Sequence, residues 1–175
     1  MFDSHIVIIA QALGFVSYGL GVLCFYQKND TKLKIIMLMM NTNNAIHFAL
    51  LGAPTASLGS VLSVFRTGLS IYYASRTIAF VFIAIALVSG YWLSSSWQDA
   101  FPIAGTCIGT YALFCLRGIA MRLAFICGAL CWLTNNILVG SIGGTLLEIT
   151  LLIVNLNTIR RLYFSDKIAL AMPKE

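Results

Sequence analysis

Residues 77–93 read TIAFVFIAIALVSGYWL, a stretch without a charged side chain that directly follows Arg76. The hydrocarbon core of a bilayer is about 30 Å thick and takes roughly 20 helical residues to cross. Fewer residues suffice where interfacial side chains such as Trp92 flank the helix. The stretch therefore predicts a membrane-spanning helix, and similar apolar stretches recur along the chain.

The composition predicts an integral membrane protein. Of the 175 residues, 59% are hydrophobic and only 10% are charged, and the mean hydropathy is +0.90. A soluble domain cannot hide that much apolar surface in one core. The N-terminal stretch MFDSHIVIIA opens with an acidic residue instead of the cationic region of a signal peptide, so we expect it to stay as the first span.

Seven segments are predicted to span the membrane, in an all-α fold. Their continuous apolar runs lack the alternation of a membrane β-barrel, which excludes that class. The loops between them are only a few residues long, which leaves no room for a soluble domain. The predicted spans cover approximately residues 5–26, 34–51, 55–73, 77–93, 100–116, 120–139 and 142–163.

The basic residues predict the orientation of these spans. With seven spans, ten of the eleven Lys and Arg residues fall on one side, and Asp3 and Asp99 fall on the other. By the positive-inside rule, the N-terminus lies outside and the C-terminus in the cytoplasm. The net charge of +5 is thereby explained by the bilayer, and no nucleic-acid partner is expected. The ten residues are Lys28, Lys32, Lys34, Arg76, Arg117, Arg122, Arg160, Arg161, Lys167 and Lys174.

The first three spans can be aligned with the last three. GFVSYGLGVLC (14–24) aligns with GTCIGTYALFC (105–115) at an offset of 91 residues. The third span then aligns with the seventh at an offset of 89, which places Arg66 on Asn155. In both halves a cationic loop joins the first two helices, and a short uncharged turn with glycine joins the next two.

This pattern predicts two three-helix units in the same orientation, joined by a linker helix, as in SWEET-type transporters. We expect the first unit over residues 1–75 and the linker helix over 76–98. The second unit is expected over 99–164, and a cytoplasmic tail over 165–175.

The second half also resembles a known family. MRLAFICGALCWLTNNILVGSIGGTLLEITLLIVNLNTIRR (121–161), above all its GSIGGT block, resembles the YgjV-type (Imp-YgjV) family of bacterial inner membrane proteins. The first half is similar in pattern at His47 and at Arg66-Thr67. The resemblance implies a bacterial inner membrane location and an architecture similar to the SWEET, PQ-loop (MtN3-like) group, whose members mostly move small solutes. The chain departs from that group because it lacks the Pro-Gln pair.

Arg66 is the one basic residue predicted inside the membrane. A charge at the centre of the bilayer costs about 2.5–3.5 kcal/mol, so such residues usually face the interior of a helix bundle. Helical spacing puts Gly59, Ser63, Arg66 and Ser70 on one small, polar face. In SWEET-like proteins, a pair of asparagines in the third and seventh helices resembles a substrate-contacting pair. The resemblance therefore implies Arg66 with Asn155 as a central substrate site, suited to an anion.

Glu148 and His47 are predicted to form a second polar layer nearer the outer face. Glu148 lies seven residues, or roughly 10 Å, closer to that face than Asn155 and therefore than Arg66, which the repeat places level with Asn155. This layer would be able to carry a proton. A structural role stays open for both charges: Arg66 and Glu148 could neutralise each other across the bundle, or bind helix carbonyls.

Asparagines near an indole add further candidates for substrate binding. Asn136 follows Trp132 by one helical turn, which offers a flat apolar face beside an amide. Asn43 occupies a comparable place in the second predicted span. Helix–helix hydrogen bonds, worth about 0.6 kcal/mol each on average, are the alternative use for these amides.

Together these features predict a carrier for a small anionic or zwitterionic solute, which crosses between the two units by alternating access. A non-transporting assembly factor or sensor with a closed polar core is the alternative. An enzyme is not expected, because no Ser/His/Asp set is present. The five cysteines lie in apolar runs without metal-ligand spacing, so neither a metal nor another cofactor is expected. Homo-oligomerisation stays open.

Overall fold

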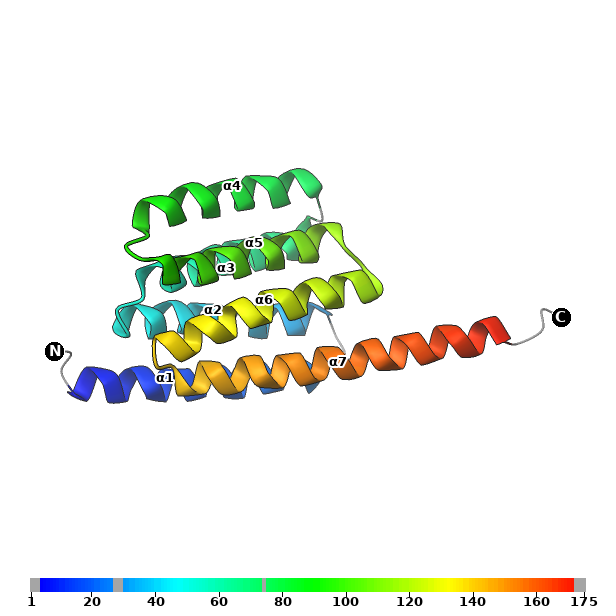
Figure 1. Ribbon diagram of the computed structural model, residues 1–175, viewed down its shortest axis with the longest axis horizontal. Coiled ribbons are helices and arrows are strands. Elements are labelled where there is room, and N and C mark those ends of the chain that lie inside the picture. The colour runs from blue at the N-terminus through cyan, green and yellow to red at the C-terminus, as the bar shows by residue number, and fades with distance from the viewer. Residues whose placement is uncertain (1–3, 27–29, 74, 172–175) are drawn as a thin grey trace.

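The computed structural model describes residues 4–26, 30–73 and 75–171, and all regular structure in these ranges is helical (Figure 1). The all-α prediction is confirmed, and each of the seven predicted segments coincides with one α-helix. A single turn of 3-10 helix, η1 (Trp97–Asp99), precedes the fifth. The α-helices are α1 (Ser4–Tyr26), α2 (Asp30–Leu50), α3 (Pro54–Tyr72), α4 (Arg76–Leu93), α5 (Ala100–Cys115), α6 (Gly118–Leu138) and α7 (Ile142–Ala171).

The turns between α2 and α3 and between α6 and α7 have the same geometry. Gly52 and Gly140 have φ angles of 69° and 71°, in the left-handed region where the absence of a Cβ avoids strain. In both turns the residue after the glycine donates its N–H to a carbonyl five residues earlier, which is the Schellman pattern of a helix end. These bonds are Ala53 to Phe48 at 2.9 Å and Ser141 to Asn136 at 2.8 Å.

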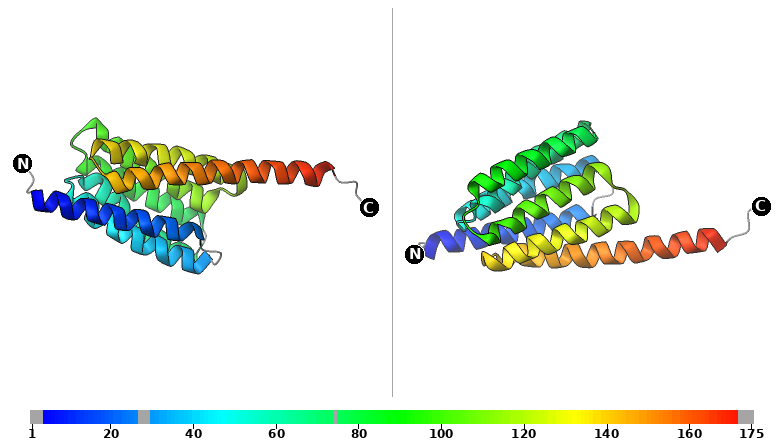
Figure 2. Two further views of the ribbon diagram at one scale, coloured as in Figure 1. Left: turned by 90° about the horizontal axis from the view of Figure 1, so that it is seen from below. Right: turned by 45° about the horizontal axis from the view of Figure 1, so that its top comes forward.

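Six of the helices form a closed ring. Consecutive helices are antiparallel, because short loops force each helix to return beside the previous one. In addition α3 packs on α5 and α7 packs on α1, which closes the ring in the order α1, α2, α3, α5, α6, α7 (Figures 1 and 2). α4 lies outside the ring and packs on α5 and, less extensively, on α3. The ring has an interior toward which polar faces can turn.

The closure of the ring at α1 and α7 depends on two glycines. A Cβ added to Gly143 would lie 2.2 Å from the carbonyl carbon and 2.3 Å from the carbonyl oxygen of Gly14. These are backbone atoms, so no side-chain rotation could make room. Small residues let membrane helices approach closely and gain van der Waals contact where the hydrophobic effect offers none.

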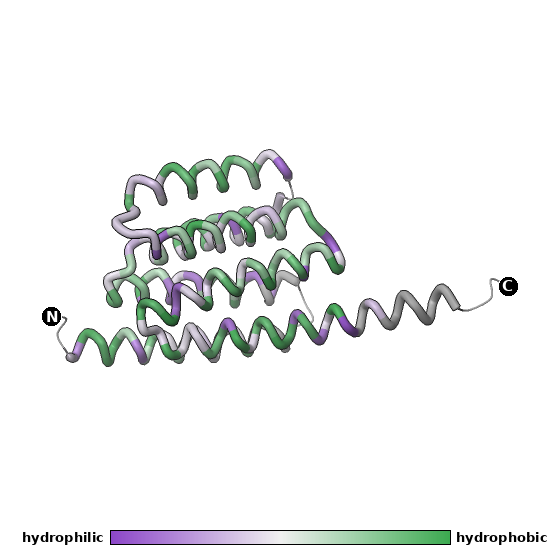
Figure 3. The backbone as a smooth tube through the Cα atoms, viewed as in Figure 1, coloured by the Kyte–Doolittle hydropathy of each residue, from purple (hydrophilic) through white to green (hydrophobic). Residues whose placement is uncertain are grey.

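The hydropathy of the helices differs with their place in the ring. Hydrophobic residues dominate α1 and α4 (Figure 3). Within the described residues, four helices are long and apolar enough to cross a membrane, over Ser4–Cys24, Arg76–Leu93, Gly118–Leu138 and Ile142–Arg160. α2 and α3 contain more polar residues, and α5 is shorter. Buried polar residues explain much of this difference, because side chains that face the ring interior do not meet lipid.

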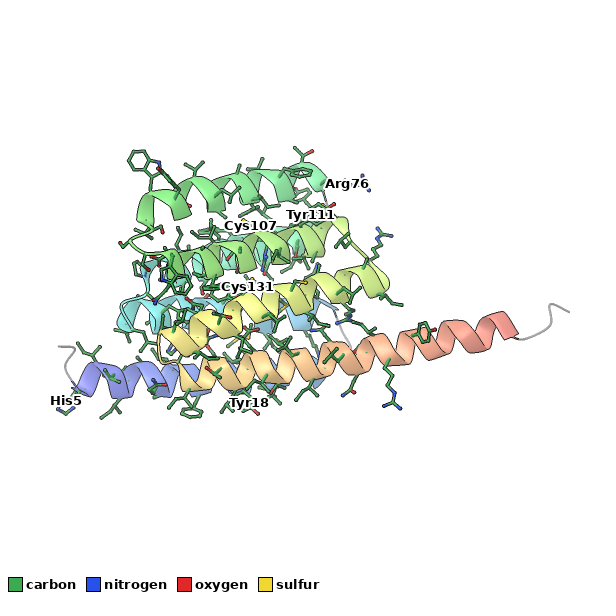
Figure 4. All side chains as sticks on the ribbon, in the orientation of Figure 1. His5, Tyr18, Arg76, Cys107, Tyr111 and Cys131 are labelled. Atoms are coloured by element: carbon green, nitrogen blue, oxygen red, sulfur yellow. The ribbon has the colours of Figure 1, made fainter. Side chains whose placement is uncertain are left out.

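The helix directions separate the two ends of the bundle. Arg76 at the start of α4 and His5 near the start of α1 lie at opposite ends (Figure 4). The described basic side chains Lys32, Lys34, Arg76, Arg117, Arg122 and Arg160 lie toward the end where α2, α4 and α6 begin. Of the residues used to predict the orientation, Asp3, Lys28 and Lys174 lie outside the described residues, as do the side chains of Arg161 and Lys167.

α7 is the longest helix, with 30 residues, and continues past the bundle (Figure 1). At 1.5 Å per residue it is about 45 Å long, more than the hydrocarbon core requires. The helix therefore runs on beyond position 164, where the sequence predicts the start of a tail.

Gly143→Ala should destabilise the protein by about 1–3 kcal/mol, because the added methyl group forces α1 and α7 apart. Gly19→Ala on α1 is the matched control: nothing lies within 4 Å of its added Cβ, so stability should stay equal or rise. Thermal unfolding of the purified proteins in detergent measures both. Equal melting temperatures for the two variants would contradict the close approach.

Candidate functional site

Arg66 extends from α3 toward α5. Its Nη1 donates to the hydroxyl of Thr110 at 3.0 Å and to the backbone carbonyl of Thr106 at 3.5 Å, and its Nη2 donates to the hydroxyl of Ser63 at 3.3 Å. The Nε atom is buried without a hydrogen-bond partner. All the partners are neutral oxygens, so among the described residues no carboxylate compensates the guanidinium.

A glycine on α5 leaves room for the guanidinium of Arg66. A Cβ added to Gly109 would lie 3.2 Å from Nη1 of Arg66. The hydroxyl of Thr106 is also buried without a partner. An unsatisfied buried polar group is costly, so two such groups on adjoining stretches of α3 and α5 indicate a place where a further polar partner would be favourable.

Glu148 is a second charge in the interior. It lies on α7 on the same helical face as Gly144 and Asn155, and only 9% of its surface is exposed. Among the described residues its carboxylate forms no hydrogen bond or ion pair. Arg66 and Glu148 therefore do not neutralise each other directly, although Arg66 does bind a helix carbonyl.

Asn155 is buried, as expected for a residue facing the interior, and its amide is bound by the protein itself. Its Oδ1 accepts a hydrogen bond from Nη1 of Arg122 at 3.3 Å, and its Nδ2 donates to the carbonyl of Leu151 at 2.9 Å. Arg122 is one of the ten basic residues expected on the cytoplasmic side, and it lies within the predicted span 120–139. Because α6 begins at Gly118, Arg122 lies one turn inside the helix, and from there its side chain reaches Asn155 on α7.

Trp132 lies across the ring interior. Its indole stacks on Phe48 of α2, with ring centroids 5.7 Å apart and an angle of 27° between the planes. Glycines on the facing helices make room: a Cβ on Gly105 would lie 2.7 Å from the indole, and one on Gly59 would lie 3.2 Å from it. The aromatic pair therefore occupies the space between α2, α3, α5 and α6.

His47 joins three helices and does not hydrogen-bond to Glu148. Its Nδ1 lies 2.6 Å from the carbonyl of Ala10, and its Nε2 lies 2.7 Å from the hydroxyl of Ser141. Since a carbonyl only accepts, Nδ1 carries the proton, and Nε2 of the neutral ring accepts from Ser141. The Ser141 oxygen accepts in turn from the N–H of Gly144 at 3.1 Å. This fully buried network links α1, α2 and α7.

The amides of Asn43 and Asn136 are also engaged by the protein. Nδ2 of Asn43 donates at 2.7 Å to the carbonyl of Leu13 and at 2.7 Å to the hydroxyl of Ser17, so this side chain binds α1. Nδ2 of Asn136 donates to the carbonyl of Trp132 at 2.9 Å. Its Oδ1 is buried without a hydrogen-bond partner. This unsatisfied oxygen faces α7, since a Cβ added to Gly144 would lie 2.2 Å from it.

Two further contacts hold the end of the bundle at which α3, α5 and α7 begin. Gln11 of α1 donates to the carbonyl of Gly140 at 2.6 Å and accepts from the N–H of Ile142 at 3.1 Å. Thr55 of α3 donates to Asp99, which also accepts from the backbone N–H of Ser95 and Ser96 at 2.9 Å each. Neither pair was predicted, because neither follows from spacing along one helix.

The described residues contain no group of three or more His, Cys, Asp or Glu side chains that could hold a metal ion. No disulfide joins the cysteines. Cys107 and Cys131 lie on the neighbouring helices α5 and α6 (Figure 4). Among the described residues, the interior offers the guanidinium of Arg66, the carboxylate of Glu148, the imidazole of His47, the indole of Trp132, and several hydroxyls and amides.

Comparisons with known proteins agree with the membrane assignment. Residues 8–166 match the profile of the Imp-YgjV family, described as bacterial inner membrane protein. The chain is also 31% identical, over 155 residues, to the inner membrane protein YgjV of Escherichia coli (strain K12). That match covers 87% of this chain and 84% of its relative. No solved structure gives a significant match.

Asp99→Asn should lower the melting temperature at neutral pH. Burial raises the pKa of Asp99, but hydrogen bonds from Thr55, Ser95 and Ser96 outweigh it and hold the pKa below its ordinary value of 3.8. A depressed pKa stabilises the fold above the unfolded value, and this contribution is lost as the pH falls through the folded value. The difference from wild type should therefore shrink below a pH of about 3.8. Gln98→Ala is the control, and a difference independent of pH would contradict the role of the carboxylate.

Proposed function

We propose that this chain, which belongs to the Imp-YgjV family of bacterial inner membrane proteins, carries a small anionic or zwitterionic solute across that membrane. The solute would bind inside the ring of helices, in contact with Arg66. All seven helices would span the bilayer, and access would alternate between the two ends of the ring.

This proposal depends on the incomplete hydrogen bonding of the Arg66 guanidinium. A guanidinium inside a bilayer costs about 2.5–3.5 kcal/mol even by lenient scales, and a protein keeps it where a partner offsets that cost. Its described partners are neutral oxygens, and Nε lacks a partner. A carboxylate or phosphate would meet the planar fork with two parallel charge-assisted hydrogen bonds, which neutral oxygens do not supply.

Two parallel three-helix units would supply the moving parts. The ring contacts support this division: α1, α2 and α3 correspond to α5, α6 and α7, and the contact of α3 with α5 corresponds to that of α7 with α1. The turns at Gly52 and Gly140, which have the same geometry, also occupy corresponding places in the two units. This correspondence supports the parallel repeat that we propose, similar to that of SWEET-type transporters, with α4 as the linker. Both contacts between the units are less extensive than the contacts within them, which favours movement between units.

The contacts near the starts of α3, α5 and α7 would form the closed outer gate of such a carrier. Trp132 stacks on Phe48 across the interior at this level. The bonds of Gln11 to the α6–α7 turn and of Thr55 to Asp99 each cross from one unit to the other. Opening this gate would break these bonds, the buried hydrogen bond between His47 and Ser141, and the stacked pair. Each is worth about 0.5–1.5 kcal/mol.

A non-transporting assembly factor or sensor is the competing function. Its mark would be a closed core in which Arg66 and Glu148 pair with each other. The neutral partners of Arg66 do not support that arrangement.

Arg66→Gln should weaken the binding of small carboxylates by about 10- to 100-fold, the worth of a charged hydrogen bond. Arg66→Lys should keep part of the affinity, because it keeps the charge but loses the planar fork. Titration of the purified protein in nanodiscs with propionate and with inorganic phosphate, followed by thermal shift, measures binding. Uptake of the same probes and of alanine, each radiolabelled, into proteoliposomes measures transport, because a zwitterion without net charge does not by itself produce a current.

Arg117→Gln, at the exposed loop between α5 and α6, is the control for these measurements and should behave as wild type. Wild-type responses from Arg66→Gln would overturn the proposed site. Binding without any transport of the bound probe would favour the sensor.

The proposed orientation has its own test. Green fluorescent protein fused after Glu175 should fluoresce, because it folds only in the cytoplasm, and alkaline phosphatase at the same position should be inactive. The positive-inside distribution of Lys and Arg is the physical reason. The reverse pair of results would place the C-terminus outside.

A further inference from the structure

Glu148 lies at the level of Trp132 on the neighbouring helix. The contact that aligns α6 with α7 lies one helical turn nearer the loop between them. There, a Cβ added to Gly144 would lie 2.2 Å from Oδ1 of Asn136. Because α6 and α7 are antiparallel, moving four residues along each helix from this contact brings Trp132 opposite Glu148. Glu148 is more than nine-tenths buried, and its carboxylate forms no hydrogen bond or ion pair among the described residues.

The indole of Trp132 lies between the level of Glu148 and the residues around Arg66. It approaches Gly59 of α3, where an added Cβ would lie 3.2 Å from the ring. The same Cβ would lie 2.7 Å from the hydroxyl of Thr106, which has no hydrogen-bond partner. Thr106 is also the residue whose carbonyl accepts from Arg66. One layer across the ring therefore runs from Glu148 through Trp132 and Thr106 to Arg66.

The guanidinium lies closer to this layer than the position of Arg66 in α3 suggests. Its partners Ser63 and Thr106 are on turns of α3 and α5 nearer the ends where these helices begin. Long side chains on a helix point back toward its N-terminus, which brings the charge of Arg66 toward the level of Trp132. The two unpaired charges thus approach one layer from opposite sides of the ring.

We infer that Arg66, Trp132 and Glu148 form a two-ended site for a small zwitterion of the α-amino-acid type. Arg66 binds the carboxylate of the solute, Glu148 binds its ammonium group, and the indole of Trp132 lies beside the solute. This inference rests on the proposed function and selects the zwitterion from the two solute classes given there.

Charge compensation favours the zwitterion over a simple anion. An anion at Arg66 leaves the carboxylate of Glu148 without a partner and adds a second negative charge to the interior, where charges are weakly screened. A zwitterion offers each protein charge an opposite one and brings no net charge. The face of an indole also attracts an ammonium group, which suits Trp132 to a place beside the cationic end.

Matched ligands test the inference. The full-length protein in nanodiscs is titrated with the twenty proteinogenic α-amino acids, and the tightest binder is compared with its deaminated acid and its decarboxylated amine. Alanine, for example, is compared with propionate and ethylamine. The wild type should bind the zwitterion about 10- to 100-fold more tightly than the acid, since the extra charged contact is lost in the acid.

Glu148→Gln should remove this preference. Its affinity for the zwitterion should fall to that of the acid, whereas its affinity for the acid should stay or rise. Thr150→Ala, on the same helix away from the ring interior, is the control and should keep the preference. A wild type that binds the acid as well as any amino acid, or a Glu148→Gln variant that keeps the preference, overturns the inference.

The two proposals fail in distinguishable ways. If Arg66→Gln keeps its affinity for propionate and for amino acids, the proposed function fails and the two-ended site fails with it. If Arg66→Gln loses both but Glu148→Gln keeps the wild-type preference, only the two-ended site fails. Thermal stability of each variant without ligand shows whether the fold is retained.

Discussion

The rest of the structure depends on one constraint, which is that hydrocarbon offers no hydrogen bonds to a side chain. Arg66, Glu148 and most of the amides described above therefore turn away from lipid. A ring of six helices provides an interior in which they can do so. The helices with the most polar residues, α2 and α3, owe their composition to faces directed at this interior or at a neighbouring helix.

Glycines decide how closely the ring closes and what its interior holds. At Gly14 and Gly143 two backbones touch, which joins the first and last helices. At Gly59, Gly105 and Gly109 the missing side chains leave room for the indole of Trp132 and the guanidinium of Arg66. Since packing is the main attraction between helices in lipid, the same small residues that hold the bundle together also shape the candidate site.

Helical periodicity predicted which residues face inward, but not their partners. The face of Arg66 and the stripe of Glu148 and Asn155 follow from spacing along a single helix. The expectation that Arg66 and Asn155 lie at the same depth in the membrane depended on aligning the third and seventh spans at an offset of 89 residues. The matching turns at Gly52 and Gly140 are 88 residues apart, which puts Thr67 on Asn155. One residue corresponds to about 100° of rotation on a helix, enough to change every contact.

The sequence by itself determined the membrane class, the number of helices, their alternating directions, the burial of Glu148 and the polar helix face on which Arg66 lies. These follow from hydropathy, length and period, which are properties of one segment at a time. Only the tertiary structure decided that α4 lies outside the ring, that Trp132 stacks on Phe48, that Arg122 reaches Asn155, and that His47 binds Ser141. Each of these depends on the distance and rotation between helices far apart in the chain, which packing of small and large side chains sets and no single segment contains.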